Sequence, residues 1–187
     1  QMCIRDSARL KVQRKIKFTC LMLDKNSLIN LLESNSISYK ITEHKPLFTV
    51  EDSKNLRGSI DGAHSKNLFL KDKKNNFFLV SFIEDIIADL KKASVPLNSK
   101  KLSFANEDYL MNILGIKPGS VSPFGLLNDK EKKVKFFFDQ EFMEYEIVNF
   151  HPLINTSTVS IAPNDLINLI EQHHSKVEFI NMRDFQK

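Results

Sequence analysis

Apolar residues along the chain recur at two spacings, one typical of helices and the other of strands. Asp24 is suited to cap a helix in which Leu28, Leu31 and Leu32 follow helical spacing, and we expect this helix to end near Ser36. The same spacing, read together with capping residues and stop signals, predicts four further helices. They are expected at 49–57, 86–93, 106–114 and 163–174.

Short runs rich in β-branched and aromatic residues lie between these helices. They predict strands at 38–43, 67–71, 77–83, 134–138, 144–150, 157–161 and 177–180. The polar stretch 72–76 separates two of the apolar runs and is typical of a hairpin turn. Runs of strands interrupted by single helices, with at least one hairpin, predict an α+β fold built on a mixed sheet.

Length and composition fit one globular domain. The chain has 187 residues, of which 42% are hydrophobic and 15 are Phe, so it can bury a full core. No apolar run approaches the 18 residues or so that a membrane span needs. Both cysteines, Cys3 and Cys20, fall in the first 21 residues. The remaining chain therefore has no disulfide, thiolate nucleophile or Cys-based metal site, which fits a reducing cytoplasm.

The basic character of the chain comes from its N-terminal segment. Residues 1–21 hold six basic side chains and one acidic one, a net charge of +5, whereas the whole chain carries +4. Residues 22–187 therefore carry −1, so charge neither supports nor excludes a nucleic-acid partner. We expect residues 1–21 to be a non-native or disordered extension, with Met22 as the true start of a single domain, 22–187.

Polar groups gather in the segment 149–158, between two predicted strands. His151 is followed by Pro152, which fixes its own φ and favours extended geometry at the histidine. Asn155, Thr156 and Thr158 then place an amide and two hydroxyls before the next apolar run. Such a cluster indicates either a site presented at the edge of a scaffold or a strand-to-strand turn in which Asn and Thr cap backbone groups.

Two other segments carry candidate chemistry. Lys66 opens an apolar strand and is followed by Asn67, so the lysine is either a functional cation or the solvated end of a strand. The loop Gly119-Ser120-Val121-Ser122-Pro123 can expose successive backbone N–H groups, because Gly119 permits a positive φ. The alternative for this segment is a plain connection between a helix and a strand.

Other catalytic classes find no support in the sequence. His173 and His174 are adjacent on a predicted helix and face different directions, while His44 and His64 lack partners at metal-ligand spacing. The chain has no Gly-x-Ser-x-Gly elbow and no Walker loop. The sequence therefore predicts no metal site and no organic cofactor.

The three segments 66–72, 119–124 and 151–158 occur in an order that resembles the YbaK-type aminoacyl-tRNA deacylases. The resemblance is closest to the free-standing prolyl-tRNA editing proteins, in which a Lys-Asn pair, a Gly-x-x-x-Pro loop and a His-Pro-x-x-Asn-Thr-x-Thr segment form the pocket. The pieces 43–46, 48–51 and 62–64 also match, and the resemblance covers roughly residues 24–182. It implies a single α+β domain with a mixed, mostly antiparallel, barrel-like sheet flanked by helices.

The resemblance also implies an activity and roles for particular residues. The activity is hydrolysis of the ester that links mischarged alanine to proline tRNA, and it needs no cofactor. The implied partner is the acceptor end of the tRNA, with prolyl-tRNA synthetase as a further candidate. Lys66, Asn67 and His151 are the implied catalytic residues, with His151 acting as a base or positioning ribose or water. The implied substrate-binding residues are Gly119, Ser120, Val121, Ser122, Pro123, Asn155, Thr156 and Thr158.

Some alternatives remain open at this stage. Phe48 and Leu68 flank the matching segments and are candidate walls of a small acyl pocket, or else ordinary core residues. Cysteine on the same tRNA is the alternative substrate within the family. A non-catalytic module that binds tRNA or a synthetase is the alternative outside it.

Overall fold

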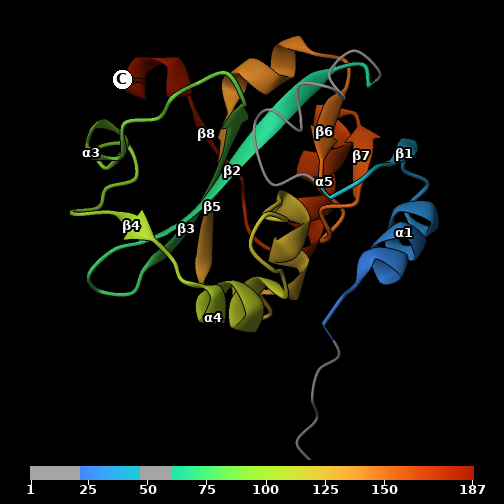
Figure 1. Cartoon of the computed structure of the whole chain (residues 1–187), viewed down its shortest axis with the longest axis horizontal. Helices are drawn as coiled ribbons and strands as arrows, with labels where there is room; N and C mark the ends of the chain where they lie inside the picture. The colour runs from blue at the N-terminus through green and yellow to red at the C-terminus, as the bar shows by residue number, and fades with distance from the viewer. Residues whose placement is uncertain (1–21, 47–59) are drawn as a thin grey trace, which may run out of the picture.

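A computed structural model describes residues 22–46 and 60–187 of the chain. Figure 1 shows a twisted sheet with helices placed around it and the C-terminus close to α3. The expected extension 1–21, the predicted helix 49–57 and the candidate wall residue Phe48 lie outside the described residues. No helix in the described ranges is both long enough and apolar enough to cross a membrane.

The sheet has eight strands and mixes antiparallel with parallel pairs, as predicted. Its order is β1-β7-β6-β2-β3-β5-β8, and β4 pairs separately with β2. Strands β2 and β3 form the predicted antiparallel hairpin, in which Lys71 lies opposite Phe77. The strand bounds are β1 Tyr39–Glu43, β2 Ala63–Lys71, β3 Phe77–Ile83, β4 Ser103–Phe104, β5 Val134–Asp139, β6 Val148–Phe150, β7 Ser157–Ile161 and β8 Glu178–Ile180.

Three of the predicted helices have the expected bounds to within two residues. Helix α1, Lys25–Ser34, begins at Asp24, whose carboxylate accepts a hydrogen bond from the Ser27 N–H at 2.8 Å. The predicted helix 106–114 is present as α4, Glu107–Tyr109, continued by one π-helical turn, Leu110–Leu114. Gly115 ends it with a φ of +66°, as expected of a glycine in that position. Helix α5 spans Pro163–His173.

The predicted helix 86–93 is wrong over its first half, because only α3, Leu90–Ala93, is helical. The carboxylate of Asp89 caps this short helix by accepting from the N–H of Lys91 at 2.8 Å. The residues before it are held instead by the C-terminal segment: Ala88 forms a bridge with Gln186, and Asp89 N–H donates to the carbonyl of Phe185. Backbone partners almost a hundred residues away thus replace the helical hydrogen bonds that local spacing predicted.

The predicted strand 144–150 is also too long, since β6 contains only Val148–Phe150. Glu144 is instead the last residue of a 3₁₀ helix, Gln140–Glu144, whose start is capped by Asp139, which accepts from the Glu141 N–H at 3.3 Å. Residues 145–147 belong to neither a helix nor a strand. Pairing with β7 begins only at Val148, which lies opposite Ile161, so the strand starts there.

Pairing in the sheet assigns residues to two faces. Val148 and Phe150 of β6 lie opposite Ile161 and Val159 of β7, and all four are buried in the core. The face that carries these residues, here called the core face, is completed by an aromatic cluster in which Phe138 contacts four other phenylalanines. These are Phe136, Phe142, Phe150 and Phe179. Asn149 and Ser160 point to the opposite face, which also carries buried core residues such as Val80 and Phe82 of β3.

Deleting residues 1–21 is expected to leave the thermal midpoint within about 4 °C of the full chain, since that segment has no apolar periodicity able to pack. Leu23, by contrast, is held by Asn128, which accepts from its N–H at 2.6 Å and donates to its carbonyl at 3.2 Å. Deletion through Leu23 is the matched control and should lower the midpoint, because Asn128 is then left without these partners. Calorimetry on the three chains compares them directly. An equal midpoint loss in both deletions would place structural contacts in the first 21 residues.

Candidate active site

Parallel pairing of β2 with β6 places Lys66 and His151 at neighbouring positions. In this pair His64 lies opposite Asn149, and both strands run in the same direction. Lys66 and His151 each follow two residues further along, so both emerge at the same end of the pair. The hydroxyl of Ser65 donates to the carbonyl of Asn149 at 2.7 Å, which holds the two strands together at this point.

Two histidine rings lie beside each other at the start of the His-Pro segment. The ring centroids of His44 and His151 are 5.9 Å apart. His151 Nδ1 lies 2.9 Å from the carbonyl oxygen of Ser157, and because a carbonyl only accepts, Nδ1 carries the proton. The Nε2 atom of His151 is therefore the acceptor in the neutral ring, and it has no hydrogen-bond partner among the described residues.

The second ring links the histidine pair to β7. His44 Nδ1 lies 2.9 Å from the carbonyl of Lys45, and His44 Nε2 lies 3.0 Å from the hydroxyl of Thr158. In the neutral ring Nδ1 donates to the carbonyl and Nε2 accepts from Thr158. The backbone N–H of His44 also donates to the carbonyl of Thr156 at 2.9 Å. His44 thus links two of the predicted substrate-binding residues, Thr156 and Thr158, to His151, a role that the sequence analysis did not assign to it.

Burial is the main reason that the pKa of His151 is lowered from its ordinary value of 6.5, and the nearby ring of His44 lowers it further. The hydrogen bond to the Ser157 carbonyl favours the charged ring but does not outweigh burial. The imidazole is therefore neutral at pH 7, and its Nε2 lone pair is available to orient or deprotonate a water molecule.

The pH dependence of activity should reflect this lowered pKa. A neutral His151 persists below pH 6.5, so we expect the enzymatic deacylation rate to decline only at a pH below 6.5. The measurement is ester hydrolysis from pH 5 to 8 with spontaneous hydrolysis subtracted, on the wild type and on His151→Gln. The variant should lose the acid limb together with most of its activity. A wild-type limb centred above pH 6.5 would contradict the burial of the ring.

The glycine loop lies against the His-Pro segment. Gly119 has a φ of +84°, a conformation that favours glycine, and a Cβ added there would stand 3.6 Å from the Asn155 amide nitrogen. The backbone of the loop therefore approaches Asn155 closely. Pro123 begins a buried 3₁₀ helix, Pro123–Asn128, in which Phe124 contacts Phe150 of the core face.

Part of the loop's hydrogen-bonding capacity is unused. The Ser120 N–H donates to the carbonyl of Lys117 at 3.1 Å, and the Ser122 hydroxyl accepts from the Phe124 N–H at 3.2 Å. The N–H groups of Gly119, Val121 and Ser122 have no acceptor within the described residues. Both serine side chains are buried, and the three N–H groups are candidate donors to a substrate oxygen.

The structure does not bring Asn67 together with Lys66. Adjacent residues of a strand point to opposite faces, and Asn67 lies on the core face opposite Ser81. Its side-chain oxygen accepts from the Ser81 hydroxyl at 2.5 Å, and its amide donates to the Ser65 hydroxyl at 3.2 Å. Asn67 is thus part of a network that joins β2, β3 and β6, while its assignment as a catalytic residue stays a prediction.

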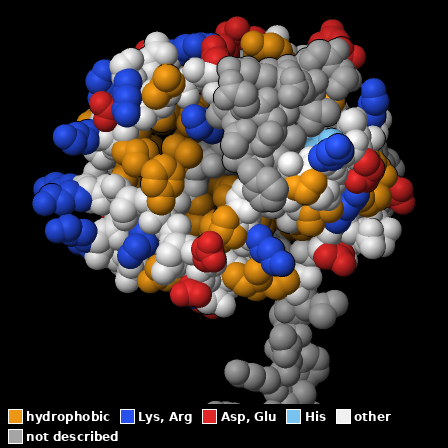
Figure 2. Space-filling view, viewed as in Figure 1, with side chains coloured by type: hydrophobic (Ala, Val, Ile, Leu, Met, Phe, Trp, Pro, Cys, Tyr) orange, Lys and Arg blue, Asp and Glu red, His pale blue; other side chains and the backbone are white. Residues whose placement is uncertain are grey.

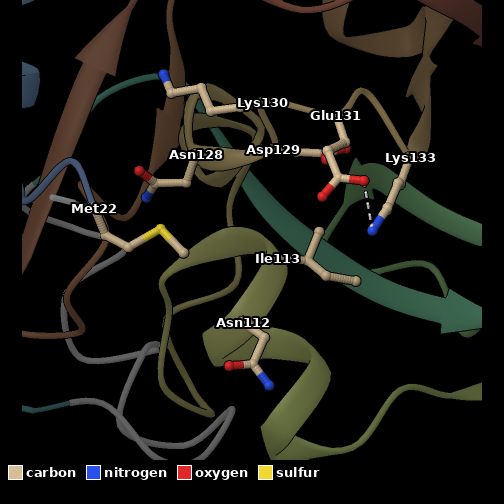
Figure 3. A pocket seen from close by; sticks show the side chains of 8 residues that line it. All are labelled: Met22, Asn112, Ile113, Asn128, Asp129, Lys130, Glu131 and Lys133. Carbon is tan, nitrogen blue, oxygen red and sulfur yellow. Dashed lines mark ion pairs between the residues drawn. The ribbon is translucent and has the colours of Figure 1, made fainter. Parts of the chain in front are cut away.

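Leu68 follows Lys66 on the same face of β2, and both line a groove of about 500 Å³. This placement neither separates Leu68 from the candidate site nor identifies it as the wall of an acyl pocket. A smaller cavity of about 160 Å³ lies elsewhere and contains none of the predicted site residues (Figure 3). Its lining is Met22, Asn112, Ile113, Asn128, Asp129, Lys130, Glu131 and Lys133. Within the described ranges, no group of three His, Cys, Asp or Glu could hold a metal ion.

Comparison with known proteins agrees with the geometry. Residues 44–169 match the family model of the aminoacyl-tRNA editing domain. The chain is 34% identical over 159 residues to the prolyl-tRNA editing protein ProX of Acetoanaerobium sticklandii, an alignment that covers 84% of this chain and 97% of the relative. It is 36% identical over 141 residues to the mouse prolyl-tRNA synthetase associated domain-containing protein 1, covering 73% of this chain and 83% of that protein.

A solved structure shares the fold. The crystal structure of a candidate trans-editing enzyme for prolyl tRNA synthetase superposes with a TM-score of 0.67 at 18% identity, covering 87% of this chain and 96% of the other. The fold and the candidate site together define the class of protein. It is an α+β domain of the editing type, whose candidate site contains a neutral histidine and free backbone N–H groups. The chain belongs to the aminoacyl-tRNA editing family, within its prolyl-tRNA editing branch, and is an aminoacyl-tRNA deacylase.

Proposed function

We propose that the protein acts in trans on proline tRNA and hydrolyses the ester of mischarged alanine. Three features support the proposal: the neutral His151, the loop at Gly119 that approaches Asn155, and the register of β2 with β6 that places Lys66 level with His151. Relatives named for prolyl-tRNA editing and for association with prolyl-tRNA synthetase support the choice of tRNA. Prolyl-tRNA synthetase is accordingly a proposed partner, and the cytoplasm the proposed location.

In the proposed reaction a water molecule attacks the ester carbonyl carbon. His151 Nε2 accepts a hydrogen bond from this water and orients it, or takes its proton. The carbonyl oxygen gains negative charge, which the loop N–H groups and the Lys66 ammonium stabilise. The bond between the carbonyl carbon and the ribose oxygen then breaks, the ribose oxygen takes a proton, and free alanine leaves.

The physical need for such an enzyme lies in the limits of size discrimination. A synthetase pocket shaped for proline cannot strongly reject alanine, because each missing methylene costs only about 1–3 kcal/mol of binding. A second pocket that admits alanine and excludes the larger ring corrects the error. The resemblance of the segments 66–70 and 151–158 to the alanine-editing proteins supports alanine as the substrate over cysteine.

Release of free amino acid from charged tRNA tests the proposal. The purified protein is mixed with alanyl-tRNA(Pro), with cysteinyl-tRNA(Pro) as the comparison and His151→Gln as the inactive control. We expect rapid release of alanine by the wild type and slow release of cysteine. Preferred release of cysteine would move the substrate to the alternative within the family, and no release from either would reject trans-editing of proline tRNA.

A further inference from the structure

The groove that contains Lys66 continues along β2 away from the histidine pair. Strand β4 pairs antiparallel with β2, with Phe104 opposite Leu70, so Phe104 lies on the face that carries Lys66, Leu68 and Leu70. Lys66 and Leu70 are four residues apart, roughly 13 Å along a strand. The groove of about 500 Å³ is lined by apolar and lysine side chains and by Asp89, whose carboxylate caps α3. It includes Leu68, Ile87, Leu90, Phe104, Lys66, Lys91 and Lys187.

Phe104 is exposed to an unusual degree for a phenylalanine. Its side chain is 62% exposed, although most of the other described phenylalanines are buried. Phe179 is the second exposed one, at 53%, but its ring packs edge-on against Phe138 of the core. Phe104 makes no ring contact with another described aromatic residue. An exposed ring on a basic-rimmed groove is the arrangement on which single-stranded nucleic acids stack their bases.

Positive charge is concentrated where the groove ends. Residues 66–104 hold eight lysines and four acidic residues, a net charge of +4, while residues 22–187 as a whole carry −1. The rest of that part of the chain therefore carries −5. Figure 2 shows Lys and Arg side chains along the edge next to an apolar patch.

The tip of this basic region is formed by two loops. The β2–β3 turn and the segment after α3 together line a hollow of about 820 Å³ that includes Lys73, Lys74, Lys100 and Lys101. These four lysines are exposed and form no ion pair with a described residue. Asp72, the buried acidic residue between them, uses its carboxylate within the turn, where it accepts hydrogen bonds from the N–H groups of Lys74 and Asn76. The lysines are therefore free to contact phosphates.

We propose that this surface receives the acceptor end of the tRNA. The single-stranded 3′ end follows β2 from Lys66, one of its terminal bases stacks on Phe104, and the phosphates where the duplex begins contact Lys73, Lys74, Lys100 and Lys101. The polarity agrees with the chemistry, because the ester at the 3′ terminus then lies at the Lys66 end of the groove, beside His151. The proposal rests on the proposed function for its choice of RNA.

The base platform is tested by a cycle that combines a protein variant with a trimmed RNA. Dissociation constants are measured for uncharged tRNA(Pro), with and without its three 3′-terminal nucleotides, on the wild type and on Phe104→Ala. We expect the variant to bind intact tRNA on the order of 10-fold more weakly and the trimmed tRNA as tightly as the wild type does. Phe179→Ala is the matched control and should bind both RNAs like the wild type. Equal weakening of both RNAs by Phe104→Ala would overturn the platform.

The phosphate contacts are tested by the salt dependence of binding to intact tRNA. For Lys74→Ala/Lys100→Ala, the slope of log affinity against log salt should fall by about 1 for each lysine–phosphate pair removed. The double variant Lys135→Ala/Lys176→Ala removes two exposed lysines at another edge of the sheet and should keep the wild-type slope. An unchanged slope in the first variant would show that these lysines do not contact tRNA phosphates. Loss of binding to prolyl-tRNA synthetase by that variant, with tRNA binding intact, would assign the surface to the synthetase instead.

These measurements use uncharged tRNA and need no hydrolysis. A protein that binds as expected but releases no alanine would reject the proposed substrate and leave the surface in place. If the protein deacylates alanyl-tRNA(Pro) but substitution of Phe104 or the lysines does not change tRNA binding, the proposed substrate stands and the proposed tRNA surface is rejected.

Discussion

Replacing Lys66 with alanine is expected to lower the deacylation rate of alanyl-tRNA(Pro) by about 100-fold or more, the usual cost of removing one donor to a developing oxyanion. Lys66 is half-buried on β2, next to the position of His151, and its side chain forms no ion pair with a described residue. Among the described residues, nothing competes with the substrate for its charge. The measurement is single-turnover hydrolysis, which separates the chemical step from tRNA release.

The controls for this variant address charge, shape and folding. Lys66→Arg should recover little activity, because a planar guanidinium does not replace a compact ammonium in a small pocket. Lys135→Ala removes an exposed lysine from β5 and should hydrolyse the ester like the wild type. The thermal midpoint of Lys66→Ala should stay close to that of the wild type, since the substitution breaks no ion pair with a described residue. Hydrolysis by Lys66→Ala at the wild-type rate would remove Lys66 from the reaction.

The elements that the sequence predicted best are those whose ends are marked locally. The apolar runs Phe77–Ile83 and Ser157–Ile161 are strands with the predicted bounds, because polar turn residues flank the strands. The failed helix prediction has a non-local cause. The helix at 86–93 is displaced by bridging to the C-terminus, and no local pattern reports such a partner.

The candidate site was predictable as three segments but not as an arrangement. The loop at Gly119 approaches Asn155 of the segment that follows His151, a contact that only the folded chain shows. The period of two in a strand already implies that Lys66 and Asn67 point apart, yet only the pairing with Ser81 shows what Asn67 contacts instead. His44 is part of the site through a bond to Thr158 across 114 residues, which requires the register of β1 with β7.

Comparison of alanyl and prolyl esters of the same tRNA is expected to give the second large effect, a preference for alanine of about 100-fold or more. A close-packed pocket resists the larger proline ring, whereas it rejects an added hydroxyl only modestly, so seryl-tRNA(Pro) should be hydrolysed at an intermediate rate. The measurement is the ratio of single-turnover rates for the three esters. Similar rates on alanyl and prolyl esters would end the editing hypothesis, because such an enzyme would destroy the correctly charged tRNA.

A single truncation links this selectivity to the groove. Leu68 lies between Lys66 and Leu70 on one face of β2, and Phe104 of β4 is opposite Leu70, so shortening Leu68 opens the space beside Lys66 toward the groove. Leu68→Ala is expected to raise prolyl hydrolysis relative to alanyl hydrolysis before it reduces the alanyl rate, because the shorter side chain relaxes the size limit. Leu90→Ala, which removes a leucine of the same groove on α3, is the matched control and should keep the wild-type ratio. An unchanged ratio in Leu68→Ala would place the wall of the acyl pocket elsewhere, whereas a changed ratio in both variants would trace selectivity to the groove as a whole.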